Sequence, residues 1–281
     1  MNGGKTMWGA ENTATRTQPP RRLTLATALA FAANFVWANA QNPASIDWQP
    51  ITSGTGQLFS IARTETTVGQ FQRFANATRL TTQAERQGGG QVYEAGWVKK
   101  PDWNWRTPFG SNHAASADEP AVHITFDEAH AFCRWAGGHL PTDAQWLEAA
   151  YTERRAAPPA PFTTGRTYPF PTGDSAAGAQ CLDDCGPAAR SRANQHGAQL
   201  LRGHGHARTG TTPAGVNGLY DMGANAWEWV DDPPGASGNA ERRTRGGSWW
   251  YGAAQMRADH LQSKPADTTV VYIGFRCARQ P

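Results

Sequence analysis

The sequence predicts a single α+β domain with little regular secondary structure. Its 281 residues include 30 glycines, 19 prolines and 12 tryptophans. Glycine and proline favour turns, while each tryptophan buries a large apolar area. Short helical and strand-like patterns are separated by long aperiodic stretches. We therefore expect a loop-rich domain over residues 44–280, held together by buried aromatic rings, after a leader at residues 1–40.

Composition excludes several classes of protein. With 17% charged residues and a mean hydropathy of −0.61, the chain is unlike a polytopic membrane protein, a coiled coil or a disordered tail. The leader holds four of the 26 basic side chains and one of the 23 acidic ones, so the formal net charge of +3 falls to zero without it. We therefore expect no nucleic-acid partner.

The leader has the features of a secretory signal. Arg21 and Arg22 precede the apolar stretch Leu23–Trp37, and small residues follow at Ala38 and Ala40. The apolar stretch is shorter than the roughly 20 residues that span a bilayer. We expect cleavage after Ala40, a periplasmic or secreted protein, and no membrane span after cleavage. The paired arginines leave the twin-arginine route open beside the general secretory one.

Three segments carry the same signal for the start of a helix, a threonine followed three residues later by Gln or Glu. Each is followed by apolar residues at helical spacing. The segments are Thr67–Gln70, Thr125–Glu128 and Thr142–Gln145. They predict three short amphipathic helices.

Strand-like runs lie at both ends of the domain, over residues 58–65, 243–250 and 270–277. Between Ala156 and Asn225 there is almost no periodicity. That stretch is too long for a plain loop. We expect a disulfide, metal ions or aromatic packing to hold it.

Four cysteines, an even number in an exported chain, allow three disulfide pairings. Cys181 and Cys185 bracket Leu-Asp-Asp, which favours a local disulfide and leaves Cys133 to pair with Cys277. The alternative for the close pair is a redox or metal site. No further cysteine or histidine pair lies nearby at zinc spacing.

Four blocks together resemble the formylglycine-generating enzyme, or sulfatase-modifying factor, family. They contain Gly-Gly-His-Leu-Pro-Thr-Asp-Ala-Gln-Trp, Asn-Ala-Trp-Glu-Trp, Arg-Gly-Gly-Ser-Trp and Gly-Phe-Arg-Cys-Ala, within residues 120–148, 217–229, 245–249 and 274–278. The resemblance implies a variant of the C-type-lectin-like fold that is stabilised by calcium. It also implies a disulfide between Cys133 and Cys277. We expect the tryptophans of these blocks to lie in the core, namely Trp135, Trp146, Trp227, Trp229 and Trp249.

The resemblance places a calcium site in Asp221–Glu228. Its ligands would be the side chains of Asp221 and Glu228 and the carbonyl groups of Ala224 and Ala226, oxygen donors of the kind that calcium prefers. The alternative is a pair of solvated acids in a tight loop.

A second calcium site of the family is doubtful here. Asn194 and Gln195 match its first two ligands, but His206 stands near the place of an expected aspartate. Imidazole is a poor calcium ligand. We expect His204 and His206 to lie at the surface, with a softer metal as the alternative.

The copper chemistry of the family's oxidases depends on two cysteines after the Gly-Gly-Ser element. Those positions carry Tyr251 and Met256 here. A phenol and a thioether do not replace two thiolates, so we expect no conversion of a sulfatase cysteine to formylglycine.

Two other branches of the family do not depend on that pair of copper-binding cysteines. Ergothioneine-type sulfoxide synthases carry iron-binding histidines in an additional N-terminal helical domain, for which the leader offers no counterpart. The exported pyoverdine-maturation branch, which oxidises a tyrosine-derived chromophore, fits better. The predicted function is thus oxidation of a peptide or tyrosine-derived substrate. Arg257, Asp259 and His260 are the candidate catalytic residues for this reaction. The alternative is that Arg257 and Asp259 form a structural ion pair and that His260 is merely exposed.

A non-catalytic lectin-like binding or accessory module is the competing prediction. Residues 88–113 have the composition of a recognition loop. Aromatic side chains could form a surface for a sugar, a peptide or a partner protein, namely Tyr93, Trp97, Trp103, Trp105, Trp249, Trp250 and Tyr251.

Overall fold

The computed structural model describes residues 42–112, 114–186, 200–231 and 241–281. They belong to one compact unit, Asn39–Pro281. The predicted secretory leader lies outside the described residues. Within these residues, no helix is long and apolar enough to cross a membrane.

The three predicted helices are confirmed. Helices α2 (Val68–Thr78), α4 (Phe126–Trp135) and α5 (Asp143–Tyr151) each begin after a threonine. Its side chain accepts a hydrogen bond from the backbone of the third helical residue, and the side chain of that residue accepts one from the threonine backbone. A fourth capping box, with Thr82 and Glu85, starts the short helix α3 (Gln83–Arg86). The same sequence pattern marks this helix, although sequence analysis did not identify it.

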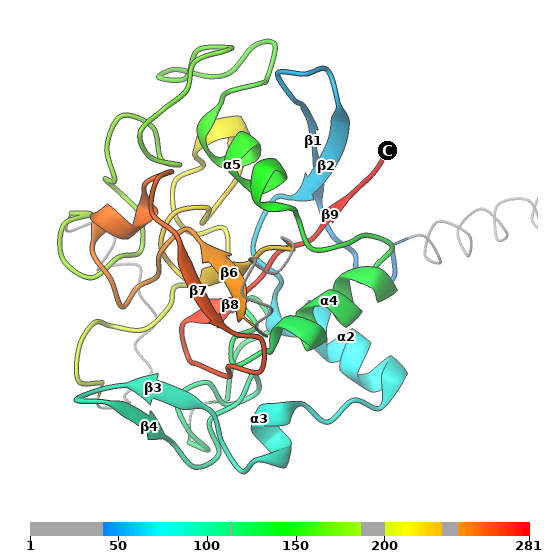
Figure 1. Ribbon diagram of the computed structural model, residues 1–281, viewed down its shortest axis with the longest axis vertical. Coiled ribbons are helices and arrows are strands. Elements are labelled where there is room, and N and C mark those ends of the chain that lie inside the picture. Colours follow the sequence, from blue (N-terminus) through cyan, green and yellow to red (C-terminus); the bar gives the residue numbers. More distant parts are fainter. Residues whose placement is uncertain (1–41, 113, 187–199, 232–240) are drawn as a thin grey trace, which may run out of the picture. The chain divides into compact units, whose positions relative to one another are not determined.

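The strands form three small sheets in the described part of the chain (Figure 1). Their order is β1-β2-β9 in one sheet, β3-β4 in the next and β7-β6-β5-β8 in the largest. The bounds are β1 (Trp48–Thr52), β2 (Leu58–Ala62), β3 (Gln91–Tyr93), β4 (Trp97–Lys99), β5 (Trp227–Trp229), β6 (Glu241–Arg245), β7 (Gln262–Pro265), β8 (Ile273–Gly274) and β9 (Ala278–Arg279). The predicted runs 58–65 and 270–277 contain the shorter strands β2 and β8, whereas the run 243–250 overlaps only the end of β6.

Strand β6 ends where the backbone turns at Gly246. This glycine has φ of +97°, and a Cβ there would lie 2.7 Å from the Met222 carbonyl oxygen. Only glycine accommodates both the left-handed conformation and the close approach.

The core is aromatic, as predicted. Phe71 and Phe74 of α2 pack on Phe132 of α4 with ring centroids 5.8 and 5.6 Å apart. Trp146, Trp227, Trp229 and Trp249 are at most 1% exposed, whereas Trp135 is partly buried.

The prediction that residues 88–113 form a recognition loop is wrong for much of that segment. It contains the β3–β4 hairpin, and Trp105 and Phe109 are buried in the core. The proposed aromatic surface is correspondingly reduced, because Trp103, Trp249 and Trp250 are buried as well. Tyr93 and Trp97 are 45% and 49% exposed.

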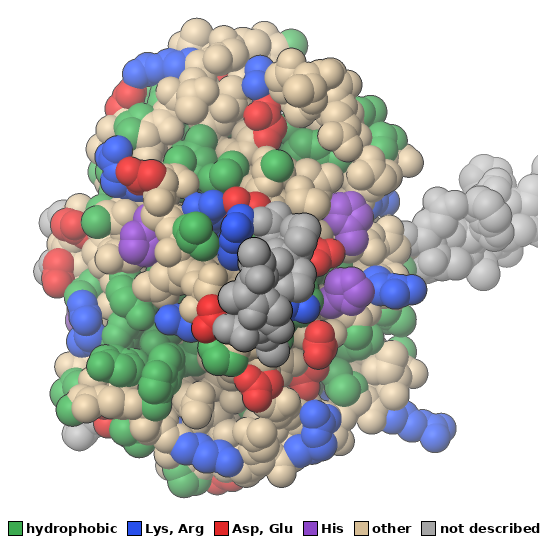
Figure 2. Space-filling view, in the orientation of Figure 1, with side chains coloured by type: hydrophobic (Ala, Val, Ile, Leu, Met, Phe, Trp, Pro, Cys, Tyr) green, Lys and Arg blue, Asp and Glu red, His purple; other side chains and the backbone are tan. Residues whose placement is uncertain are grey.

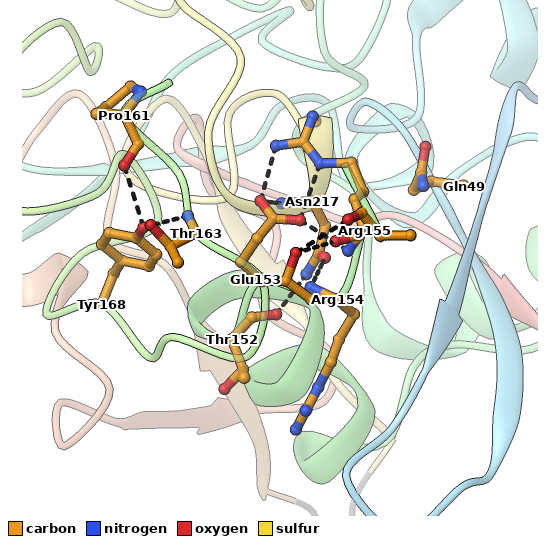
Figure 3. A network of polar contacts seen from close by, with 12 residues as sticks. Gln49, Thr152, Glu153, Arg154, Arg155, Pro161, Thr163, Tyr168 and Asn217 are labelled. Atoms are coloured by element: carbon orange, nitrogen blue, oxygen red, sulfur yellow. Dashed lines mark hydrogen bonds and ion pairs between the residues drawn. The ribbon is translucent and has the colours of Figure 1, made fainter. Parts of the chain in front are cut away.

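A polar network anchors one end of the aperiodic stretch (Figure 3). Glu153 accepts hydrogen bonds from the Arg155 guanidinium and from the Asn217 backbone. The Asn217 amide in turn donates to the carbonyl groups of Ala149 and Thr152. Burial alone would raise the pKa of Glu153, but the hydrogen bonds from Arg155 and Asn217 outweigh it and lower the pKa. Charged hydrogen bonds therefore join the disulfide and aromatic packing as supports of this stretch.

A second ion pair lies deeper in the core. The Arg276 guanidinium, which has no exposed surface, donates to both carboxylate oxygens of Glu228 at 2.7–2.9 Å. It also donates to the carbonyl groups of Ala62 and Tyr220, while the Trp146 indole donates to Glu228. This arrangement ties β2, α5, β5 and the segment before β9 together.

We predict that Arg276→Met lowers the free energy of unfolding by about 3–5 kcal/mol, because it leaves a buried carboxylate without its partner. Chemical denaturation measures this change. Arg257→Met is the matched control, since the Arg257–Asp259 pair is exposed and should contribute about 1 kcal/mol or less. Equal effects of the two substitutions would contradict the prediction.

Candidate functional site

Three residues that follow the Gly-Gly-Ser element, Trp250, Tyr251 and His260, pack with Trp227 and Tyr272 in a cluster of rings. The Tyr251 ring lies 5.8 Å from the Trp227 ring and 5.7 Å from the Tyr272 ring. The His260 ring lies 5.7 Å from Trp227, tilted by 31°. Trp250 stacks on Tyr272 at 5.8 Å. We call these five residues the aromatic cluster.

Several polar atoms of the aromatic cluster are buried without a hydrogen-bond partner in the described structure. They are the Tyr272 hydroxyl, His260 Nε2 and Trp227 Nε1. The Tyr272 hydroxyl lies close to Tyr251, but not in hydrogen-bonding geometry. Buried polar groups are usually paired, so three unpaired ones in a single cluster indicate a place where a polar ligand could bind.

Burial favours the neutral forms of two side chains of this cluster, Tyr272 and His260. It raises the pKa of Tyr272 well above its ordinary value, with Tyr251 adding to the effect. It lowers the pKa of His260, and the nearby Arg245 adds to that effect against Asp259. A neutral imidazole can accept a proton, and a neutral phenol can donate a hydrogen bond.

Of the three candidate catalytic residues, the structure brings only His260 into the aromatic cluster. Arg257 and Asp259 form a 3.5 Å ion pair, with side chains 51% and 79% exposed. They therefore match the alternative of a surface pair, whereas His260 is partly buried against Trp227.

Tyr251 and Met256 lie in different surroundings. Tyr251 packs in the aromatic cluster, whereas Met256 is fully buried in a separate apolar group with Cys181 and Cys185. Met256 is the last residue of a short 3-10 helix, η2 (Ala253–Met256), which begins two residues after Tyr251.

A group of buried carboxylates forms next to the Arg276 ion pair. Glu65, Asp221 and Glu228 are all at most 5% exposed. Burial and the neighbouring Asp221 and Glu228 raise the pKa of Glu65 well above its ordinary value, against the attraction of Arg276. Burial likewise raises the pKa of Asp221. Three carboxylates facing one guanidinium therefore cannot all be ionised unless a further cation is bound.

These residues fit a divalent cation in charge and in backbone conformation. Asp221, Ala224 and Asn225 have φ between +55° and +63°, an unusual run of left-handed residues in one loop. Asp221 accepts hydrogen bonds from Gly210 and Thr212 and keeps further acceptor capacity. Glu228 would share its carboxylate between the cation and Arg276.

The remaining predicted residues are placed as follows. Cys133 is bonded to Cys277 and Cys181 to Cys185, the expected pairing. His204 is exposed. The prediction that His206 lies at the surface is wrong, because it is buried beside Phe109 and its Nε2 lies 2.8 Å from Glu119. Asn194 and Gln195 lie outside the described residues.

Sequence reasoning missed two residues of these sites, Glu65 and Tyr272. Each had a signal: an acid at the end of an apolar strand, and a hydroxyl within the apolar run Val-Val-Tyr-Ile-Gly-Phe. A polar group in a run that must be buried needs a partner.

Comparison with known proteins relates these features to one family. The family model described as "Sulfatase-modifying factor enzyme 1-like domain" matches residues 14–281. The bovine formylglycine-generating enzyme is 27% identical over 263 residues, which cover 76% of this chain and 63% of that protein. Hercynine oxygenase of Mycolicibacterium thermoresistibile is 30% identical over 78% of this chain and 50% of its own length. A mouse protein named inactive C-alpha-formylglycine-generating enzyme 2 is 26% identical over 82% of this chain and 77% of its own length.

Solved structures share the fold. The crystal structure of CarF aligns with a TM-score of 0.54 at 18% identity, over 85% of this chain and 99% of CarF. PvdO from Pseudomonas aeruginosa aligns with a TM-score of 0.52 at 17% identity, over 84% of this chain and 92% of PvdO. The mixed small sheets and helices are those of the sulfatase-modifying-factor variant of the C-type-lectin-like fold.

Proposed function

We propose that this chain, which belongs to the family of sulfatase-modifying factor enzyme 1-like domains, is an exported oxidoreductase that acts on a peptide or tyrosine-derived substrate. It would do so without cysteines at the positions of Tyr251 and Met256. The observation that carries the proposal is the aromatic cluster with its unpaired polar atoms.

The cluster suits a substrate that is both aromatic and polar. A phenol-derived ring can pack against Trp227 and Tyr251, since aromatic pairs gain stability beyond the area that they bury. Its hydroxyl and amide groups could satisfy the buried atoms of Tyr272 and His260. A cysteine side chain would satisfy fewer of them.

Each polar residue of the cluster has a distinct proposed role. His260 Nε2, neutral because burial lowers its pKa, would accept a proton from the substrate as dioxygen takes up two electrons from it and, with two protons, is reduced to hydrogen peroxide. The Tyr272 hydroxyl, kept protonated by burial, would donate a hydrogen bond that orients the ring. The relatives named as formylglycine-generating enzymes and as an oxygenase support oxidative chemistry in this family.

The proposal is tested by incubating the protein in air with a tyrosine-containing peptide and with a cysteine-containing sulfatase peptide. We predict that the tyrosine peptide loses two hydrogens and that the cysteine peptide is unchanged, as seen by mass spectrometry. His260→Ala should lower the rate about 10²–10⁴-fold, whereas His204→Ala, at an exposed position, should not. Because the pKa of His260 is lowered, the rate should rise with pH and pass its half-maximum below the ordinary histidine pKa of about 6.5. Formylglycine on the cysteine peptide would overturn the proposal.

We also propose that calcium stabilises the fold at Asp221 and Glu228, with the carbonyl groups of Ala224 and Ala226 completing the site. The buried carboxylates of Glu65, Asp221 and Glu228 cannot all be ionised beside one guanidinium, which supports a divalent cation here. Its role would be structural, neutralising carboxylates that otherwise repel one another.

We predict that a calcium chelator lowers the melting temperature. A ligand bound only to the native state adds about 2.7 kcal/mol at a hundredfold excess over its dissociation constant. Glu228→Gln and Asp221→Asn should each reduce the difference between calcium and chelator, while Glu148→Gln, a carboxylate outside the loop, should retain it. Identical melting curves in calcium and chelator for the unmodified protein would refute calcium binding.

A specific observation supports the second candidate, a binding module. Tyr93 and Trp97 lie edge to face at 5.4 Å on the β3–β4 hairpin, where hydrophobic side chains gather (Figure 2). Trp97 lines a cavity of about 360 Å³ together with amide, hydroxyl and charged side chains, namely Gln83, Gln87, Gln91, Lys264, Asp267, Thr268 and Thr269. An exposed ring beside many hydrogen-bonding groups suits a saccharide.

We predict that, if the protein is a binding module for saccharides, Trp97→Ala abolishes its binding on a glycan array. Leu58→Ala removes an equally exposed apolar residue outside the cavity and should leave binding intact. Saccharide binding with no turnover of the tyrosine peptide would favour the module over the enzyme. An array without any bound glycan would exclude saccharides as its ligands.

A further inference from the structure

The Arg202 guanidinium lies against the aromatic cluster. Its central carbon is 5.5 Å from the centre of the Trp250 ring, which stacks on the Tyr272 ring. Burial raises the pKa of the Tyr272 hydroxyl, whereas the positive charge of Arg202 acts to lower it. Arg202 itself is exposed. A cation that solvent can reach therefore acts on the polar atoms of the cluster.

The loop that carries Arg202 is fixed against the core. Gly203 has φ of +71°, and a Cβ there would lie 2.9 Å from a carbon atom of the Trp249 ring. Two residues further on, the Gly205 carbonyl oxygen accepts a hydrogen bond from the Gln180 side chain at 3.0 Å. Only glycine combines this conformation with so close an approach. The backbone next to Arg202 is thus held in place.

The Arg202 guanidinium has no carboxylate partner in the part of the chain that the structure describes. Arg208, six residues later on the same loop, pairs with Asp118 at 3.6 Å. By contrast, none of the described residues forms an ion pair or a hydrogen bond with the Arg202 guanidinium. A guanidinium carries five N–H donors in a planar fork that matches a carboxylate. Those of Arg202 are available to a ligand.

The unpaired polar atoms around Arg202 are mostly donors. They include the Tyr272 hydroxyl and the Nε1 atoms of Trp227 and Trp249, all buried. The Trp249 ring lies 5.3 Å from the Trp250 ring and 6.3 Å from the Tyr272 ring. An indole N–H can only donate, whereas an ionised carboxylate offers two oxygens that only accept. This region therefore matches an anion better than it matches a neutral amide.

We propose that Arg202 determines the specificity of the aromatic cluster by binding a carboxylate that the substrate carries beside its tyrosine-derived ring. This inference rests on the proposed oxidation and names the class of its substrate, an acidic tyrosine peptide or derivative. The guanidinium donates two parallel hydrogen bonds to the carboxylate while the ring packs in the cluster. Such a bidentate contact fixes orientation as well as adding affinity.

Arg202 takes no part in the transfer of protons or electrons, because a guanidinium stays protonated in proteins. Its effect falls on binding of the substrate, so its loss raises KM for an acidic substrate and changes kcat little. The carboxylate has two sources in a peptide. One is the side chain of an acidic residue next to the tyrosine, and the other is the free carboxyl end of a terminal tyrosine.

The test is equilibrium binding to the full chain, measured by isothermal titration calorimetry without oxygen so that no peptide is oxidised. The first peptide has tyrosine between two glutamates, and the second has tyrosine between two glutamines, both with blocked ends. The third is the glutamine peptide shortened to end in tyrosine with a free carboxylate. We predict that the first or the third binds about tenfold more tightly than the second, which identifies the source. Equal affinity for all three would overturn the proposal.

Variants of one loop separate this role from a general effect of charge or folding. Arg202→Gln should bind the preferred peptide and the blocked glutamine peptide equally well. Arg202→Lys should keep part of the preference, because it retains the charge but not the planar fork. Arg208→Gln, the matched control, should keep all of it. Persistence of the preference in Arg202→Gln, or its loss in Arg208→Gln as well, would contradict the assignment.

Turnover in air distinguishes this inference from the proposed function. A preference for carboxylate peptides that lose no hydrogens in air would support the role of Arg202 and refute the oxidation. Oxidation of acidic and neutral peptides with equal kcat/KM would support the oxidation and refute the role of Arg202. If both hold, Arg202→Gln raises KM for the preferred peptide about tenfold.

Discussion

The Arg276 guanidinium and the Glu228 carboxylate neutralise each other in a part of the molecule that water does not reach. A buried ion pair remains stable only when all of its donors and acceptors are satisfied. The guanidinium therefore requires carbonyl groups from β2 and from Tyr220, and the carboxylate requires the Trp146 indole of α5. Elements far apart in sequence meet because this single pair needs partners from all of them.

The ion pair also fixes the candidate site. Glu228 is the central residue of β5, so the neighbouring Trp227 and Trp229 point to the opposite face of the strand. Trp229 donates a hydrogen bond to the Ile124 carbonyl oxygen, and Trp227 packs against His260 and Tyr251. A strand held rigidly by its charged side chain thus presents Trp227 to the aromatic cluster. The same carboxylate interacts with Glu65 and Asp221, the group at which we propose that calcium binds.

Membership of a family with oxidative members does not decide the chemistry of this chain, since function depends on the residues of the site. Tyr251 and Met256 contribute to different environments, one aromatic and one rich in sulfur. The aromatic environment is the one in which we propose that the substrate binds, whereas the other holds the Cys181–Cys185 disulfide. The two lie next to each other because Leu182 bonds to the Tyr251 carbonyl oxygen.

Local sequence patterns predicted those features that depend on contacts between residues close together in the chain. Among the described residues, threonine with Gln or Glu three residues later marks a helix start wherever it occurs, because the capping bonds close within one turn. The close spacing of Cys181 and Cys185 likewise limits their pairing. Tertiary structure decided the rest: that Trp105 is buried while Trp97 is exposed, that His206 pairs with Glu119, and that Glu65 joins Asp221 and Glu228. These contacts join residues tens of positions apart, and their burial depends on which segments pack together, which no local pattern records.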